Sequence, residues 1–359
     1  MNLGQPVLNP TSSPTGRLNL GLSRLGSEWP KPSPIQNFFW KQVALMAAMT
    51  GAVIAGVATT TAGQEQSQEH CSSVVVSRLL GSSAPVCDSS VIRSRAKDGH
   101  VFEENQLGIS SILAIGPDFS EKEAVAWFQR AAHQGYAPAE VNLAVMYING
   151  WGTAVNYAAG LHWLQVAADQ RFARAYYNLG ILYLEGKGVR QDNTEAFRWF
   201  EKGAKAGDSS AQTNLGYMYD LGLGCTRNVK TAAEWYRKGA DAENPLAENN
   251  LADLYLKGQG VEQDDAAAFH WFQRAAAQGN TGARIKLGYM YANGKGTSKN
   301  LQTAYAWVKA AETAGDPRAN DLLQALEKVL TPTQLAAARE EAGKLQQPTV
   351  QLSAKSFAQ

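Results

Sequence analysis

The sequence lacks the residue patterns on which most catalytic and metal-binding sites depend. It contains three cysteines, and none of them forms a C-x-x-C pair, which argues against a zinc module and against a thioredoxin-like redox site. The histidines are scattered, and neither an H-E-x-x-H metal motif nor a G-x-S-x-G nucleophile motif is present. The sequence therefore predicts no catalytic residue, no metal site and no cofactor, and indicates that the protein is not an enzyme.

The sequence also lacks an excess of charge of either sign. Lysine and arginine total 33, against 32 aspartate and glutamate residues. Nucleic acids and anionic membranes attract proteins through surplus positive charge, so this balance predicts neither of them as a partner of the whole chain.

The N-terminal part is poor in apolar residues until an uncharged stretch begins. Residues 1–41 are rich in Pro, Ser, Gly and Asn and carry one acidic residue, Glu28, so we predict a disordered basic leader. Residues 42–63, QVALMAAMTGAVIAGVATTTAG, follow as an apolar core that ends in small residues near Ala62. This order is typical of a cleaved secretory signal, and it predicts a periplasmic or secreted protein.

Other interpretations of this N-terminal part stay open. The stretch 42–63 is long enough to span a bilayer, although its Ala, Thr and Gly content makes it a weak span, so an uncleaved anchor in the inner membrane is the main alternative. The length of the leader is also compatible with a start codon placed too early or with an organellar transit peptide. Contact with a membrane is expected only through this segment.

Residues 64–100 are polar and Ser-rich, and we interpret them as a linker. They contain Cys71 and Cys87. In an oxidising compartment these two cysteines could form a disulfide, whereas in cytosol they would stay free.

What the sequence has in abundance is one repeated unit of 36 residues. Its landmarks are a leucine, a tyrosine, a Gly-x-Gly pair and a tryptophan, and agreement at several independent positions indicates a stacked solenoid. The leucines are Leu143, Leu179, Leu215, Leu251 and Leu287, and the tryptophans are Trp127, Trp163, Trp199, Trp235, Trp271 and Trp307.

Each unit reads as two helices. In the unit 173–208, Ala175, Leu179 and Leu182 fall at helical spacing and predict a first helix with one buried stripe. The pair Gly186-Lys187-Gly188 ends that helix, because glycine readily supplies the positive φ that a tight exit needs. Asp192 then suits the N-cap of a second helix, in which we assign Trp199 to the core.

These landmarks resemble the Sel1-like repeat family, whose solenoids are related to tetratricopeptide repeats. The family motif runs roughly A-x-x-x-L-G-x-x-Y-x-x-G-x-G, then an acidic or amide residue, then A-x-x-W and A-A-x-x-G. The resemblance implies an all-α fold, a right-handed α/α superhelical solenoid, which acts as an adaptor for a protein or peptide partner.

The register predicts six units between residues 101 and 316, the first of them degenerate, as is expected of a terminal unit that faces water. A C-terminal cap of residues 317–347 follows, with a helix that starts near Thr331, and then a tail of residues 348–359.

The candidate binding residues lie on the first helices, at positions that the buried stripe leaves free. One column is nearly all asparagine, and a second column beside it varies in chemistry. A carboxamide offers both a donor and an acceptor, so a spaced column could hold an extended peptide backbone on a concave face. The alternative is that these asparagines bond to nearby backbone groups. The first column is Asn142, Asn178, Asn214, Asn250 and Lys286, and the second is Val145, Ile181, Tyr217, Asp253 and Tyr289.

Three functions follow from this sequence. We favour a non-enzymatic adaptor of the cell envelope. A cysteine-rich secreted branch of the resembling family is linked with β-lactam binding or hydrolysis, but its members carry paired cysteines in each repeat, and here only Cys225 lies inside the repeats. A secreted hydrolase of that type is therefore the less favoured alternative, and a purely structural spacer is the third.

Overall fold

The computed structural model describes residues 89–113 and 120–346, and within these ranges all regular structure is helical. The segments 1–41, 42–63 and 348–359, and most of 64–100, lie outside the described residues. Twelve helices form six antiparallel pairs, as the repeat predicted. The pairs are α4 (Val101–Leu113) with α5 (Glu121–His133), α6 (Ala137–Asn149) with α7 (Tyr157–Asp169), α8 (Ala173–Glu185) with α9 (Asn193–Lys205), α10 (Ser209–Leu221) with α11 (Val229–Asp241), α12 (Pro245–Lys257) with α13 (Asp265–Ala277), and α14 (Thr281–Asn293) with α15 (Leu301–Thr313).

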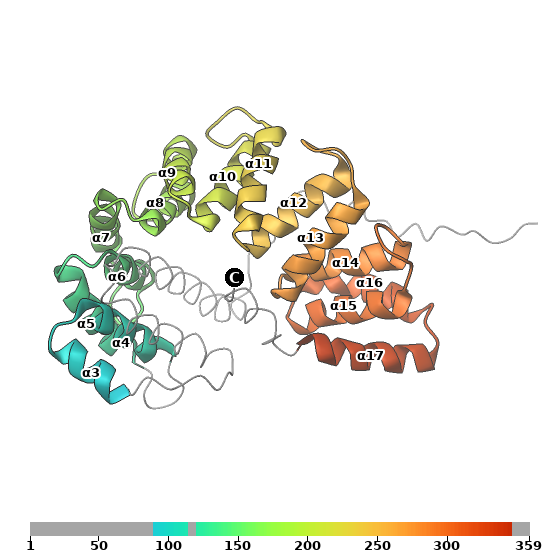
Figure 1. Ribbon diagram of the computed structural model, residues 1–359, viewed down its shortest axis with the longest axis horizontal. Helices are drawn as coiled ribbons and strands as arrows, with labels where there is room; N and C mark the ends of the chain where they lie inside the picture. The colour runs from blue at the N-terminus through green and yellow to red at the C-terminus, as the bar shows by residue number, and fades with distance from the viewer. Residues whose placement is uncertain (1–88, 114–119, 347–359) are drawn as a thin grey trace, which may run out of the picture.

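The pairs stack side by side into an arc (Figure 1). The first helices α4, α6, α8, α10 and α12 line the inner side of the arc, and the second helices α7, α9 and α11 lie on its outer side. This arrangement confirms the predicted class, an all-helical solenoid of six repeated units. The side of each of these first helices that packs on neither its own second helix nor the adjacent unit therefore faces the hollow of the arc.

The turns and caps explain why each unit has the same shape. The first helix α8 ends at Gly186, which has a φ of 69°, and the second helix α9 begins at Asp192, whose carboxylate accepts hydrogen bonds from the backbone N–H groups of Thr194 and Glu195. The predicted N-caps are confirmed in the other units as well: Asn156, Asn228, Asp264 and Asn300 each accept a bond from the first turn of the following helix.

The second glycine of most turns is fixed by a neighbouring backbone. Gly224 has a φ of 68°, and a Cβ atom there would lie 2.2 Å from the carbonyl oxygen of Asn193 at the start of α9. No other residue fits this contact, so the turn of one unit rests directly on the second helix of the unit before it.

The core differs from the sequence assignment in one respect. The fully buried large side chain of the second helix is Phe200, the residue after Trp199, and it packs against Gly180, where a Cβ would lie 2.6 Å from the ring. Trp199 is only half-buried and packs on a core cluster that the preceding unit shares with the first helix of its own unit, with the Lys202 Nζ 4.1 Å from its ring centroid. Trp199 therefore joins units, whereas the column after it fills them; the equivalent Trp271 of the fifth unit is buried in the core, as assigned. That column is Phe128, Leu164, Phe200, Tyr236, Phe272 and Val308.

Short helices close both ends of the array. The helix α3 (Ser89–Lys97) falls within the predicted linker and packs on α4, with Ala96 fully buried. At the other end, α16 (Asn320–Glu327) follows a single 3-10 turn (Pro317–Ala319), and α17 (Pro332–Gln346) packs along α15. Thr331 and Gln334 cap α17 through reciprocal side-chain-to-backbone bonds, which agrees with a helix predicted to start near Thr331.

Candidate partner-binding face

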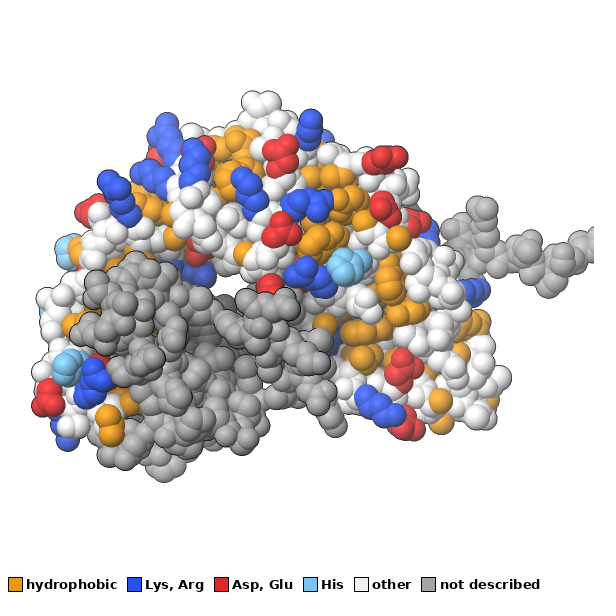
Figure 2. Space-filling model, in the orientation of Figure 1, with side chains coloured by type: hydrophobic (Ala, Val, Ile, Leu, Met, Phe, Trp, Pro, Cys, Tyr) orange, Lys and Arg blue, Asp and Glu red, His pale blue; other side chains and the backbone are white. Residues whose placement is uncertain are grey.

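The two predicted columns lie on the first helices of the units, most of which line the inner side of the arc (Figure 1). On the side shown in Figure 2, basic and acidic side chains are interspersed with apolar ones over the arc, and no large field of one sign appears. The hydrogen bonds of the asparagine column are not uniform. We call the ends of the column tied, because their side chains bond to other side chains, and its centre open, because among the described residues the side chains there bond only to their own helix.

The first end of the column is tied between units. Asn142 is buried, and its Nδ2 donates a 2.9 Å hydrogen bond to the Oδ1 of Asn105 on the neighbouring helix α4. Gln106, which stands 36 positions before Asn142, is the buried first member of the same column. Sequence reasoning missed Gln106 because the first unit is degenerate, although subtraction of the repeat length would have found it.

The other end is tied through charge. The ammonium group of Lys286 bonds to the carboxylate of Asp253 and, at 3.2 Å, to the Oδ1 of Asn249. The same ammonium lies 5.1 Å from the ring centroid of Phe272. Burial lowers the pKa of the Lys286 ammonium, and Asp253 opposes that effect. Two residues that the sequence placed in separate columns thus form one ion pair across the fifth and sixth units.

Asn250 is tied as well, to its own helix and to the preceding unit. Its Oδ1 accepts a 3.1 Å bond from the Nδ2 of Asn249, and its side chain also hydrogen-bonds with the hydroxyl of Tyr236 on helix α11. The fifth member of the column therefore serves the packing of the units around it.

The centre of the column is different. Asn178 and Asn214 each donate one Nδ2 hydrogen to the backbone carbonyl four residues earlier, at 3.0 and 2.9 Å. Within the described part of the chain no group donates to the Oδ1 of either residue, because the positions that face them across the unit junction are not amides. Both carboxamides therefore keep an acceptor and one donor hydrogen for another molecule.

The second column supplies partly exposed apolar surface beside these amides. Ile181 and Tyr217 are half-buried. Ile181 packs against a core cluster of the third and fourth units, and Tyr217 against a cluster that extends from the fourth unit to the sixth. Tyr289 has the same exposure in the sixth unit, whereas Val145 in the second is buried. Leu221, at the end of α10, is half-exposed and extends the apolar surface.

A cation close to this centre, Arg174, is already neutralised. Arg174 lies 3.0 Å from the carboxylate of Asp208, donates to Ser210 in the next unit, and stands over the ring of Tyr177. Burial raises the pKa of Asp208, and Arg174 opposes this effect. The centre of the face thus combines amides, an aliphatic side chain and aromatic rings with no unpaired charge from Arg174.

Among the described residues, no cluster of three or more His, Cys, Asp and Glu side chains is arranged to hold a metal ion. Within the same residues, none of the helices combines the length and the apolar character that a bilayer crossing requires.

The 36-residue units match a known family model. The Sel1 repeat model matches residues 114–136, 137–172, 173–208, 209–244, 245–280 and 282–316, which together make up more than half of the chain. The chain belongs to the Sel1 repeat family. Sel1 repeats form helical solenoids, as the fold described above does, and members of the family commonly mediate protein–protein interactions and are generally non-catalytic.

Solved Sel1 repeat structures share the fold. A protective antigen present in uropathogenic Escherichia coli strains, which displays an SLR fold, is 30% identical with a TM-score of 0.57; the match covers 72% of this chain and 56% of the antigen. A Sel1 repeat protein from Oxalobacter formigenes is also 30% identical with a TM-score of 0.53, over 59% of this chain and 85% of that one. This chain thus spans little more than half of the antigen's length. A comparison with curated proteins gave no match.

Proposed function

We propose that this Sel1 repeat protein is a non-enzymatic adaptor that binds an extended segment of a protein partner along the inner face of its solenoid. The observation that supports this most is the contrast within the asparagine column. Asn142, Asn250 and Lys286 are held by other side chains, whereas Asn178 and Asn214 keep hydrogen-bonding capacity that no described residue uses.

The chemistry of the centre fits a peptide backbone. A peptide group presents one N–H and one C=O, and a carboxamide can pair with both without reading the side chains. Ile181 and Tyr217, which lie next to the two open asparagines, would contact the partner's side chains. Because Arg174 is paired with Asp208, and Lys286 with Asp253, the segment that fits best is uncharged.

The cell envelope is the proposed location. The support is in the sequence, where the basic leader 1–41 precedes the uncharged stretch 42–63, and this part lies outside the described residues. Cell fractionation and N-terminal sequencing of the mature chain test it. Recovery of the repeats in the periplasm or medium, with a new N-terminus near residue 63, is expected; full-length soluble protein in cytosol with Met1 retained contradicts it.

The adaptor proposal is tested by site-specific photo-cross-linking in the producing cell. A photoreactive residue in place of Ile181 should capture a defined protein partner. The same residue in place of Glu234, which is exposed on the outer helix α11, serves as the matched control and should not. Equal capture of the same protein from both positions would show that the inner face has no special role.

A further inference from the structure

A recurring polar contact joins the two helices of some units. Near the start of the first helix lies a fully buried glutamate, and the glutamine that caps the end of the second helix donates to it. In the fifth unit the Nε2 of Gln278 lies 2.8 Å from one carboxylate oxygen of Glu248, and the Nε of Arg274 lies 2.9 Å from the other. The first and second units have the same contact, in Glu104 with Gln134 and in Glu140 with Gln170.

The contact follows a simple rule along the chain. In units whose second helix ends in a glutamine cap, the position near the start of the first helix is glutamate. In units whose second helix ends in an alanine cap, another residue replaces this glutamate. The three replaced units pair Tyr176 with Ala206, Gln212 with Ala242, and Arg284 with Ala314. In the sixth unit the replacement is a reversal of charge, because an arginine stands where a carboxylate stands in the fifth.

Arg284 is left with neutral partners. Its Nε and Nη1 donate to the carbonyl oxygens of Ala276 and Ala310, in the last turns of α13 and α15, each at 3.2 Å. No carboxylate of the described chain lies within ion-pair distance of it, and burial lowers the pKa of its guanidinium. The Nη2 group and one hydrogen of Nη1 are bonded to nothing in the described residues.

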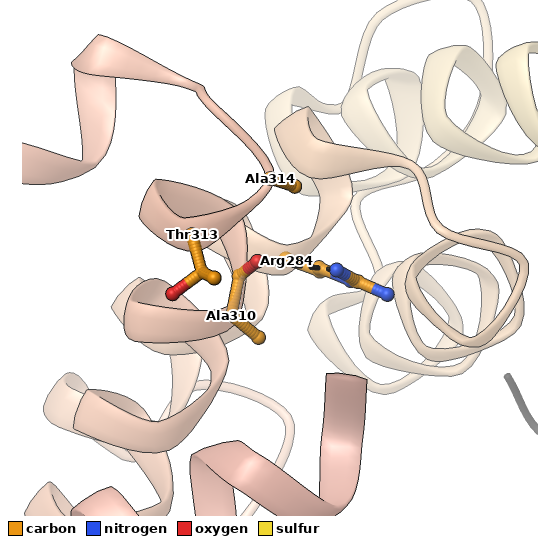
Figure 3. A pocket seen from close by; sticks show the side chains of 4 residues that line it. All are labelled: Arg284, Ala310, Thr313 and Ala314. Atoms are coloured by element: carbon orange, nitrogen blue, oxygen red, sulfur yellow. Dashed lines mark hydrogen bonds between the residues drawn. The ribbon is translucent and has the colours of Figure 1, made fainter. Parts of the chain in front are cut away.

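A pocket opens beside this arginine. It has a volume of about 270 Å³ and is lined by Arg284, Ala310, Thr313 and Ala314. Figure 3 shows the Arg284 side chain next to Ala310 and Ala314, with the hydrogen bond to the Ala310 carbonyl as a dashed line. Thr313 and Ala314 are exposed, so the pocket is accessible to solvent. In the fifth unit Arg274 and Gln278 occupy the positions that Ala310 and Ala314 hold here.

We propose that this pocket binds a carboxylate group of another molecule, carried either by an aspartate or glutamate side chain or by the C-terminus of a peptide. The carboxylate would complete at Arg284 the ion pair that Glu248 and Arg274 make within the fifth unit. A guanidinium with free N–H groups binds a carboxylate through charge-assisted hydrogen bonds. The proposal goes beyond the inner-face adaptor function and does not depend on it, since the pocket lies where α13 and α15 end.

The test uses three acetylated tripeptides and the full-length protein, with binding followed by chemical shifts of the backbone amides of Thr313, Ala314 and Gly315. The first peptide is Ala-Glu-Ala with an amidated C-terminus, the second is Ala-Ala-Ala with a free carboxylate, and the third is amidated Ala-Ala-Ala, which carries no charge. Saturable shifts are expected with the first or the second peptide, and the one that binds more tightly identifies the source of the carboxylate. No saturable shift is expected with the third.

Two variants and one control separate the pocket from general electrostatics. Arg284→Gln keeps an amide donor near the carbonyls but removes the charge, and Ala314→Gln fills the pocket with the residue that caps the fifth unit. Each should weaken carboxylate binding about tenfold or more, because a charge-assisted bond is replaced or blocked. Lys309→Gln removes a nearby charge outside the pocket and should leave binding unchanged. Equal shifts with the neutral peptide, unchanged binding in both pocket variants, or no saturable shift with any peptide would overturn the proposal.

Discussion

Asn142 donates a 2.9 Å hydrogen bond to Asn105 across the junction between the first two units, whereas Asn214, in the same column, bonds only to the carbonyl of Ser210 in its own helix. The two asparagines occupy equivalent positions in equivalent helices. The difference arises in the residue of the preceding unit that faces each asparagine. Asn142 faces the amide of Asn105, and the residue that corresponds to Asn105 for Asn214 is Tyr177. One column of identical residues therefore serves packing at one end and leaves capacity for binding at its centre.

The first prediction concerns the core. Phe200→Ala should destabilise the array by about 3 to 5 kcal/mol, because a fully buried ring is removed and its neighbours collapse only in part. Trp199→Ala should cost clearly less, since its side chain is only partly buried, between two units. Denaturant unfolding of both variants measures the difference, and a greater loss in the Trp199 variant would contradict the assignment of Phe200 as the core residue.

The second prediction concerns the turns. Gly224→Ala should be strongly destabilising, because the added Cβ would meet the Asn193 carbonyl and the residue has a positive φ. Gly207→Ala is the matched control, since Gly207 also has a positive φ but has no atom within 4 Å of the added Cβ. The control should lose about 1 to 2 kcal/mol from its left-handed backbone alone. Equal melting temperatures for the two variants would show that the turn does not rest on the preceding unit.

The third prediction concerns pH. Burial raises the pKa of Glu248 to about 7, and Arg274 and Gln278 only partly offset this. The folded state thus holds a proton more tightly than the unfolded state, so the contribution of Glu248 to stability is present below pH 4.5 and is lost as the pH rises toward 7. The loss should not exceed about 3 kcal/mol, since one pKa unit corresponds to 1.36 kcal/mol.

Glu248→Gln isolates this effect, because the amide keeps the shape of the side chain and does not titrate. Unfolding free energies of the parent and the variant, measured between pH 4.5 and 8, should diverge as the pH rises, with the parent losing more stability. Parallel curves would show that Glu248 titrates alike in the folded and unfolded states. Burial also raises the pKa of Glu104 and Glu140, so only the difference between parent and variant is informative.

Much of the fold could be predicted from the sequence because its signals are local. The caps at Asp192 and its equivalents, and the left-handed exit at Gly186, depend on residues within one turn of the chain. The choice between Phe200 and Trp199 as the core residue could not be predicted, since adjacent residues both fall within a broad apolar stripe. The helix α3 was also missed, because its nine residues are mainly polar and stand apart from the repeat.

The candidate site could be predicted only in part, for a different reason. The period places Asn178 and Asn214 on one face with Ile181 and Tyr217. The bond that each asparagine makes depends on the residue that faces it from another unit, such as Asn105 opposite Asn142 or Asn249 opposite Lys286. To predict those pairings, one must know how neighbouring helices are offset along their axes. A column of identical residues in the sequence does not reveal that offset.

The central claim is that the open asparagines bind a partner rather than hold the units together. Its most direct test is to measure partner affinity and melting temperature on the same purified Asn214→Ala variant, with the partner captured by the cross-link at position 181. The account predicts affinity weakened by about 0.5 to 1.5 kcal/mol, the usual net contribution of one hydrogen bond, and an unchanged melting temperature. A lowered melting temperature with affinity intact would contradict it.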